Sequence, residues 1–92
     1  MDAKQIPGWE TLQEDPPKLR KEFVFNNFIE ALDFVNQVGD LAESMDHHPD
    51  IFISYKKVVL TLFTHDVNGL SDKDYTLAEK INYLKTDPKT GI

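Results

Sequence analysis

The 92-residue sequence contains no cysteine, only four glycines and no long apolar run. The lack of cysteine excludes a disulfide framework and a zinc cluster held by thiolates. No apolar run approaches the roughly 18 residues of a membrane-spanning helix. The first residues, "MDAKQIPGW", lack the basic start and apolar core of a signal peptide. We therefore expect a cytoplasmic protein with no membrane segment.

Basic residues are also scarce: 10 Lys and Arg stand against 16 Asp and Glu, so the net charge is −6. DNA, RNA and anionic membranes all attract basic surfaces, so a small molecule or a protein is the better candidate partner. The hydrophobic and charged fractions, 40% and 28%, are those of an ordinary globular chain. We predict one domain over residues 1–92, with a core from about residue 6 to residue 85. Its core is thin, which favours self-association.

Two short strands are predicted at the start of the chain. "PGWETLQ" opens with a turn signal and carries Trp9 and Leu12 as its bulky residues. Pro16 and Pro17 interrupt it because proline cannot donate to a strand ladder. In "RKEFVFNN", the alternation of Phe23 and Phe25 is typical of a half-buried strand. The two strands are expected to pair as a hairpin across the prolines.

Residues 28–45 have the period of an amphipathic helix. Their apolar stripe comprises Phe28, Leu32, Val35, Val38, Ala42 and Met45, widened by Ile29, Ala31, Phe34 and Leu41. Asn27 and Glu30 resemble a helix-start capping box. Pro49 is expected to end the helix, because a residue before proline is pushed out of the α region. The stripe is broader than one thin sheet requires, which suggests a partner subunit.

"IFISYKKVVLTLFTH", residues 51–65, is rich in β-branched and aromatic residues and predicts two strands joined by a turn near Lys56–Lys57. Alternate residues of the second strand face opposite sides of the sheet. One set is uniformly aliphatic and should meet the helices: Val58, Leu60 and Leu62. The other set is Val59, Thr61, Phe63 and His65.

The chain then turns and ends with a second helix. Asn68–Gly69 predicts the turn, and Ser71 begins the helix. The helix has the apolar set Tyr75, Leu77, Ala78, Ile81 and Leu84. Residues 86–92 are expected to fray. The order β-β-α-β-β-α predicts an α+β domain, with a four-stranded antiparallel sheet and helices packed on one face.

Chemistry in this sequence must come from histidines and carboxylates, because it has no phosphate-binding glycine loop, GxSxG, HExxH or cysteine nucleophile. His47 and His48 stand side by side before Pro49. Adjacent helical residues point about 100° apart, but a chain that turns at the proline could direct both imidazoles into one cavity. Each can exchange a proton near neutral pH. The alternative is structural, since histidines interact well with carbonyls at a helix end.

The remaining polar candidates also have structural alternatives. His65 and Asp66 lie where a strand runs into a turn, which suits either a site or ordinary surface residues. Asp74 fits a capping box with Ser71, and Glu43 suits a solvated helix face. Three imidazoles with Asp46 or Asp66 could bind Zn²⁺, although small intracellular zinc sites more often use cysteine.

The candidates share one longer pattern that resembles the signature of the pterin-4a-carbinolamine dehydratase family. The pattern runs through Glu43, His47-His48-Pro49, Tyr55, His65 and Asp74, with three, five, nine and eight residues in the successive gaps. "PGW", "FVF", "AES", "THDVNGLSDKD" and "LAEKI" also resemble the family, so the likeness covers roughly residues 6–84. Ile51 departs from it, since some members carry tryptophan there.

The resemblance implies an α+β subunit that assembles into homodimers or homotetramers and acts without a metal or an organic cofactor. It implies removal of water from 4a-hydroxytetrahydropterins to give quinonoid dihydropterins, in tetrahydropterin recycling. The implied acid–base residues are His47, His48 and His65. The implied supporting or substrate-binding residues are Glu43, Asp46, Pro49, Thr64 and Asp74. The same fold in some relatives implies an alternative, a non-catalytic interaction or assembly factor.

Overall fold

The computed structural model describes residues 6–84. In chain order its elements are β1 (Glu10–Leu12), β2 (Lys18–Val24), α1 (Phe28–Met45), β3 (Asp50–Ser54), β4 (Lys57–Leu62), the short 3-10 helix η1 (His65–Val67) and α2 (Asp72–Asn82). The predicted order β-β-α-β-β-α is confirmed. The predicted fraying of residues 86–92 lies outside the described residues, as do both ends of the predicted single domain.

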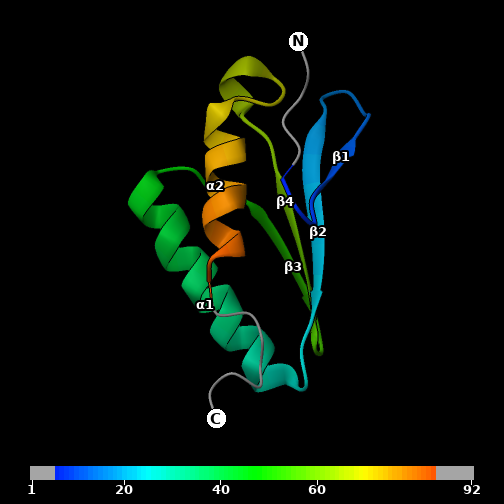
Figure 1. Ribbon diagram of the computed structural model, residues 1–92, viewed down its shortest axis with the longest axis vertical. Helices are drawn as coiled ribbons and strands as arrows, with labels where there is room; N and C mark the ends of the chain where they lie inside the picture. The colour runs from blue at the N-terminus through cyan, green and yellow to red at the C-terminus, as the bar shows by residue number, and fades with distance from the viewer. Residues whose placement is uncertain (1–5, 85–92) are drawn as a thin grey trace.

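The four strands form one antiparallel sheet in the order β1-β2-β4-β3, and both helices lie on the same face of it (Figure 1). The predicted hairpin across the prolines is confirmed, because β1 pairs antiparallel with β2. The predicted inward face of β4 is confirmed as well: Val58, Leu60 and Leu62 are all buried. They pack in one core with Phe34 of α1 and Leu77 of α2. The fold class predicted from the sequence is therefore correct.

The turn between β3 and β4 lies one residue earlier than predicted. Ser54 pairs with Lys57, so the turn residues are Tyr55 and Lys56 rather than Lys56 and Lys57. Tyr55 adopts a positive φ of 55°. Glycine or asparagine is the usual residue at a turn position with positive φ. A tyrosine at this position therefore gave no sequence signal for the turn.

Helix α1 ends at Met45, before the predicted stop at Pro49. Asp46 takes the left-handed conformation, with φ 53° and ψ 41°. Its N–H donates to the carbonyl of Glu43, and the N–H of His47 donates to that of Ala42. These two bonds form a Schellman motif, with aspartate where glycine is usual. The chain therefore leaves the helix one residue before the histidine pair, and Pro49 only follows.

Two other boundaries also differ from prediction. Strand β4 ends at Leu62, so His65 begins the 3-10 helix instead of continuing the strand. Helix α2 ends at Asn82, so Leu84 packs against the core from beyond the helix. The predicted turn at Asn68–Gly69 is present, and Asn68 supplies the positive φ of 52°. Each boundary is set by local backbone geometry that hydrophobic periodicity does not report.

Helix α1 leaves apolar side chains at its start in contact with solvent. Phe28 and Ile29 are 43% and 63% exposed. Exposed apolar surface of this kind is compatible with the partner subunit expected from the sequence, and that expectation stays a prediction. Within residues 6–84, neither helix has the length and apolar character needed to cross a bilayer.

The positive φ of Tyr55 allows a test of the hairpin turn. A side chain in this region costs about 1–2 kcal/mol, which glycine does not incur. After the larger unfolded-state entropy of glycine is allowed for, we expect Tyr55→Gly to raise the free energy of unfolding by about 0.5–1 kcal/mol in urea denaturation. Lys56→Gly is the matched control and should lower it, because Lys56 has no positive φ. Equal changes in the free energy of unfolding for the two variants would contradict the assignment of a positive φ to Tyr55 alone among the two turn residues.

Candidate functional site

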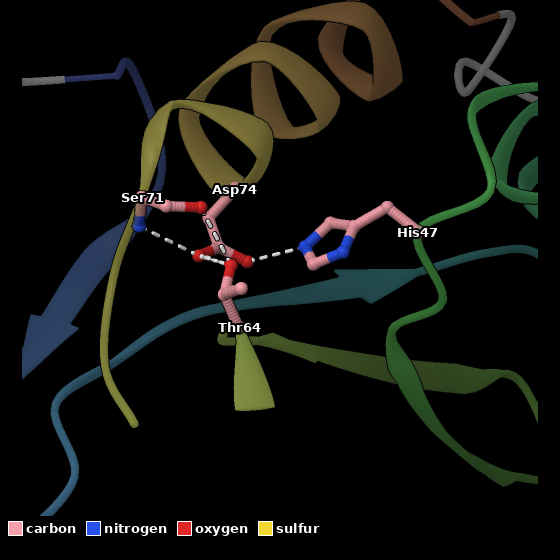
Figure 2. A network of polar contacts seen from close by, with 4 residues as sticks. All are labelled: His47, Thr64, Ser71 and Asp74. Atoms are coloured by element: carbon pink, nitrogen blue, oxygen red, sulfur yellow. Dashed lines mark hydrogen bonds and ion pairs between the residues drawn. The ribbon is translucent and has the colours of Figure 1, made fainter. Parts of the chain in front are cut away.

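The carboxylate of Asp74 is completely buried and connects three segments of the chain. Its Oδ1 lies 2.6 Å from Nε2 of His47, in the loop after α1. Its Oδ2 accepts the hydroxyl of Thr64, 2.7 Å away at the end of β4, and the N–H of Ser71, 3.0 Å away. Figure 2 shows Asp74 at the centre of these contacts. A buried carboxylate requires such partners, and this one has three.

Asp74 also fulfils the helix-start role predicted for it. As the third residue of α2, it accepts the N–H of Ser71, the N-cap residue. Its other oxygen is left for His47. The Thr64 hydroxyl is in addition 2.7 Å from that of Ser71. One side chain therefore caps a helix and contacts an imidazole. The capping role is confirmed, and the supporting role at a site stays a prediction.

His47 is held with a defined tautomer. A carboxylate can only accept, so the Nε2 that faces Asp74 must carry the proton in this hydrogen bond. The side chain is 10% exposed and lies against a cavity. In the neutral imidazole, Nδ1 is then the unprotonated nitrogen. This arrangement gives His47 one nitrogen able to take a proton.

His48 pairs with a different carboxylate on the outside of the molecule. Its Nε2 lies 2.9 Å from Oε1 of Glu43, in the last turns of α1. Both side chains are well exposed, at 57% and 81%. An exposed pair of this kind contributes little stability, but it orients the ring. The two adjacent histidines thus each present Nε2 to a carboxylate, one buried and one in solvent.

A cavity of about 460 Å³ lies between these histidines and the end of β4. Its lining residues are Asp46, His47, His48, Pro49, Asp50, Phe63, Thr64, His65, Asp66 and Lys73. Six of them were predicted from the sequence as site residues: Asp46, His47, His48, Pro49, Thr64 and His65. The other two predicted residues, Glu43 and Asp74, do not line the cavity but contact histidines that do. Asp66, which the sequence offered as a neighbour of His65 and as a possible zinc ligand, lines the cavity too.

Sequence reasoning missed three lining residues. Phe63 packs against His65 with the two rings tilted by 49° and their centroids 4.4 Å apart. Lys73 adds an amine to the lining, and Asp50 adds a carboxylate. The spacing of Lys73, one residue before Asp74, carried no signal for a site, because exposed lysines are common in a first helical turn.

Tyr55, part of the sequence pattern, lies away from this cavity. It occupies the tip of the β3–β4 hairpin, whereas Asp50 at the other end of β3 lines the cavity. Nor do residues 6–84 hold a group of three or more His, Asp or Glu arranged to bind a metal ion. The arrangement gathers proton carriers and carboxylates around a space suited to a small ligand.

The fold and the cavity together define an α+β domain with a site of histidines held by carboxylates. The family model for pterin 4 alpha carbinolamine dehydratase matches residues 1–84. The chain therefore belongs to the pterin-4a-carbinolamine dehydratase family, as the sequence pattern predicted.

Known relatives agree with this assignment. A Rubrobacter xylanophilus protein named "Putative pterin-4-alpha-carbinolamine dehydratase" is 49% identical over 82 residues, which cover 89% of this chain and 75% of the relative. A Saccharolobus solfataricus protein of the same name is 43% identical over 84 residues, covering 91% and 86%.

Solved structures share the fold, and two of them can be compared with this chain. One is the transcriptional coactivator/pterin dehydratase from Brucella melitensis, with a TM-score of 0.78, 35% identity and coverage of 84% of this chain and 81% of that one. The other is a pterin dehydratase-like protein identified as a RuBisCO assembly factor in the alpha-carboxysome. Its TM-score is 0.73, with 23% identity and coverage of 87% and 92%, so it shows the fold alone.

The hydroxyl of Thr64 should contribute measurably to stability. Thr64→Val removes a donor to the buried Asp74 carboxylate, so we expect the free energy of unfolding to fall by about 1–3 kcal/mol in urea denaturation. Thr61→Val, three residues earlier on β4, is the control, because its side chain faces away from the helices, and its effect should stay within about 0.5 kcal/mol. Similar effects at the two positions would argue against the network.

Proposed function

We propose that the protein is a 4a-hydroxytetrahydropterin dehydratase, a hydro-lyase that releases water and quinonoid dihydropterin. The observation that carries the proposal is the meeting of His47, His48 and His65 around one cavity. The sequence separates His65 from the other two by a complete hairpin. Family membership supports the same reaction class.

The reaction requires only proton transfers, so histidines can perform it. A base takes the proton from the ring nitrogen while an acid protonates the 4a-hydroxyl. The C4a–O bond breaks, a C=N bond forms and water leaves. No electron is exchanged with a cofactor, and a positioned acid or base contributes about 10²–10⁴-fold to such a step. His47, His48 and His65 are the proposed acid–base set, with the roles of acid and base shared among them.

Asp74 is the proposed positioning residue for His47. Its carboxylate fixes Nε2 as the protonated nitrogen, which leaves Nδ1 to exchange a proton with the substrate. Glu43 acts on His48 in the same way from the solvent side. Asp46, Pro49 and Thr64 complete the proposed substrate-binding or supporting set.

The proposed setting is a cytoplasmic homodimer or homotetramer that takes a small pterin and needs no metal, nucleic acid or membrane. The acidic net charge of −6 supports a small-molecule partner over nucleic acid. The cavity volume of about 460 Å³ falls within the range of small-molecule sites.

Activity can be tested through the decay of the 4a-carbinolamine absorbance. We expect the wild-type protein to accelerate the decay beyond its spontaneous rate. His48→Ala should remove most of the acceleration, by about 10²–10⁴-fold, because a proton carrier is lost. Lys56→Ala, at the far end of the β3–β4 hairpin, is the control and should retain the activity. The absence of acceleration by the wild-type protein would refute the proposal.

A non-catalytic role is the alternative, favoured by the exposed apolar residues at the start of α1. A structure of the same fold is described as a RuBisCO assembly factor, although the similarity of that protein concerns the fold alone. An interaction factor would use Phe28 and Ile29, which are exposed, instead of the histidine cavity. The complete histidine set supports the enzyme, because a scaffold does not require it.

Paired variants distinguish the two functions. In an enzyme, His47→Ala with His48→Ala abolishes the cellular function, whereas Phe28→Ser with Ile29→Ser leaves turnover per active site largely intact. In an interaction factor the pattern reverses, because the exposed apolar residues carry binding and the histidines do not. Complementation of a strain that lacks this protein with each pair provides the measurement. Loss of complementation by the helix pair alone would exclude the catalytic proposal as the cellular role.

A further inference from the structure

A second cavity, also of about 460 Å³, lies at the opposite end of α2 from the histidines. It is lined by Pro7, Gly8, Lys21, Glu79, Asn82 and Tyr83. None of these residues lines the histidine cavity. The second cavity is thus formed by the last turn of α2, the segment before β1 and the middle of β2.

Lys21 occupies an unusual place in the sheet. Leu19 and Phe23, two residues to either side of it on β2, are buried in the core beneath the helices. Side chains on a strand alternate between faces, so Lys21 lies in the same inward row. An apolar residue is expected there, and a departure from this pattern commonly marks a functional position.

The ammonium of Lys21 has little compensation from its surroundings. Its Nζ donates to Oδ1 of Asn82 at 2.9 Å and lies 4.8 Å from the centre of the Phe23 ring. Among residues 6–84 no carboxylate lies within ion-pair distance of it. Burial lowers the pKa of Lys21, in keeping with a charge that is partly removed from water. An ammonium has three donors, and the described residues use one of them.

Asn82 holds this lysine in place. Its Oδ1 accepts both Lys21 Nζ and the indole N–H of Trp9, which is 3.1 Å away. Its Nδ2 donates to the carbonyl of Pro7 at 3.0 Å. Gly8 permits the close approach: it has a φ of 85°, and a Cβ there would lie 2.6 Å from Nζ. The cavity is therefore built around the amine of Lys21. Trp9, the single tryptophan of the chain, shares the Asn82 acceptor with this amine, so its indole N–H signal can be used to follow binding.

We infer that this second cavity binds a small organic monocarboxylate, whose carboxylate pairs with Lys21. The free donors of a partly desolvated ammonium form strong, charge-assisted bonds to an anion. Pro7 and the ring of Tyr83 offer apolar contact to the body of the ligand. Glu79 lines the same cavity, and its negative charge disfavours dianions such as phosphate. This site is independent of the proposed dehydratase activity.

Benzoate is a suitable probe, followed by ¹⁵N–¹H NMR of the full chain at neutral pH. We expect saturable shifts of the Trp9 indole signal and of the amides of Gly8, Lys21 and Asn82. Lys21→Gln should weaken benzoate binding about tenfold or more, because a charge-assisted bond is lost. Lys80→Gln is the matched control: it removes the same charge from the last turn of α2, outside the cavity lining. Lys80→Gln should leave the affinity for benzoate within about twofold of the wild-type value.

Other probes test the ligand class. Acetate, which lacks an apolar body, and inorganic phosphate should both bind more weakly than benzoate. Absence of saturable shifts, equal losses in the two lysine variants, tighter binding of phosphate, or shifts centred on His47, His48 and His65 would each overturn the inference.

If Lys21→Gln does not fold, the exposed Glu79 provides the test. Glu79→Gln should tighten benzoate binding about two- to threefold, and unchanged or weaker binding would contradict the proposal.

Discussion

The buried carboxylate of Asp74 is the interaction on which the site depends. A charge with no solvent contact must be paired and hydrogen-bonded, or its burial costs several kcal/mol. Thr64, Ser71 and His47 meet this requirement from the end of β4, the start of α2 and the loop after α1. The packing of these three segments therefore places the first histidine and one wall of the cavity. The contacts that satisfy this buried charge also bring the parts of the site together.

Helix α2 serves both cavities through polar side chains at its two ends. At its start, Asp74 accepts hydrogen bonds from the Thr64 hydroxyl and the Ser71 N–H (Figure 2). Its other carboxylate oxygen contacts Nε2 of His47. At its end, Asn82 accepts from Trp9 and Lys21 and donates to Pro7. Between them, Leu77, Ala78 and Ile81 anchor the helix in the core. This packing fixes the position of the helix, and with it the polar groups at both ends.

Periodicity predicted the elements because burial on one face imposes it. The helix over residues 28–45, the inward face of β4 and the fold class follow from residue spacing alone. The boundaries were harder to predict. Asp46 and Tyr55 both adopt positive φ without being glycine, so α1 ended earlier and the hairpin turned earlier than expected. An aspartate or a tyrosine in a sequence does not by itself predict a positive φ.

The sequence by itself determined the element order and the family pattern, because these depend on residue type and spacing, and the resemblance to the family then implied the eight candidate residues. Only the tertiary structure decided which residues meet. It brought His65 to the histidine pair across the β3–β4 hairpin, added Phe63 and Lys73 to the cavity and left Tyr55 at the far end of the hairpin. It also gave Lys21 its place in the core row beside Asn82. Contacts between distant segments depend on how helices pack on the sheet, and local sequence does not encode that geometry in any single stretch.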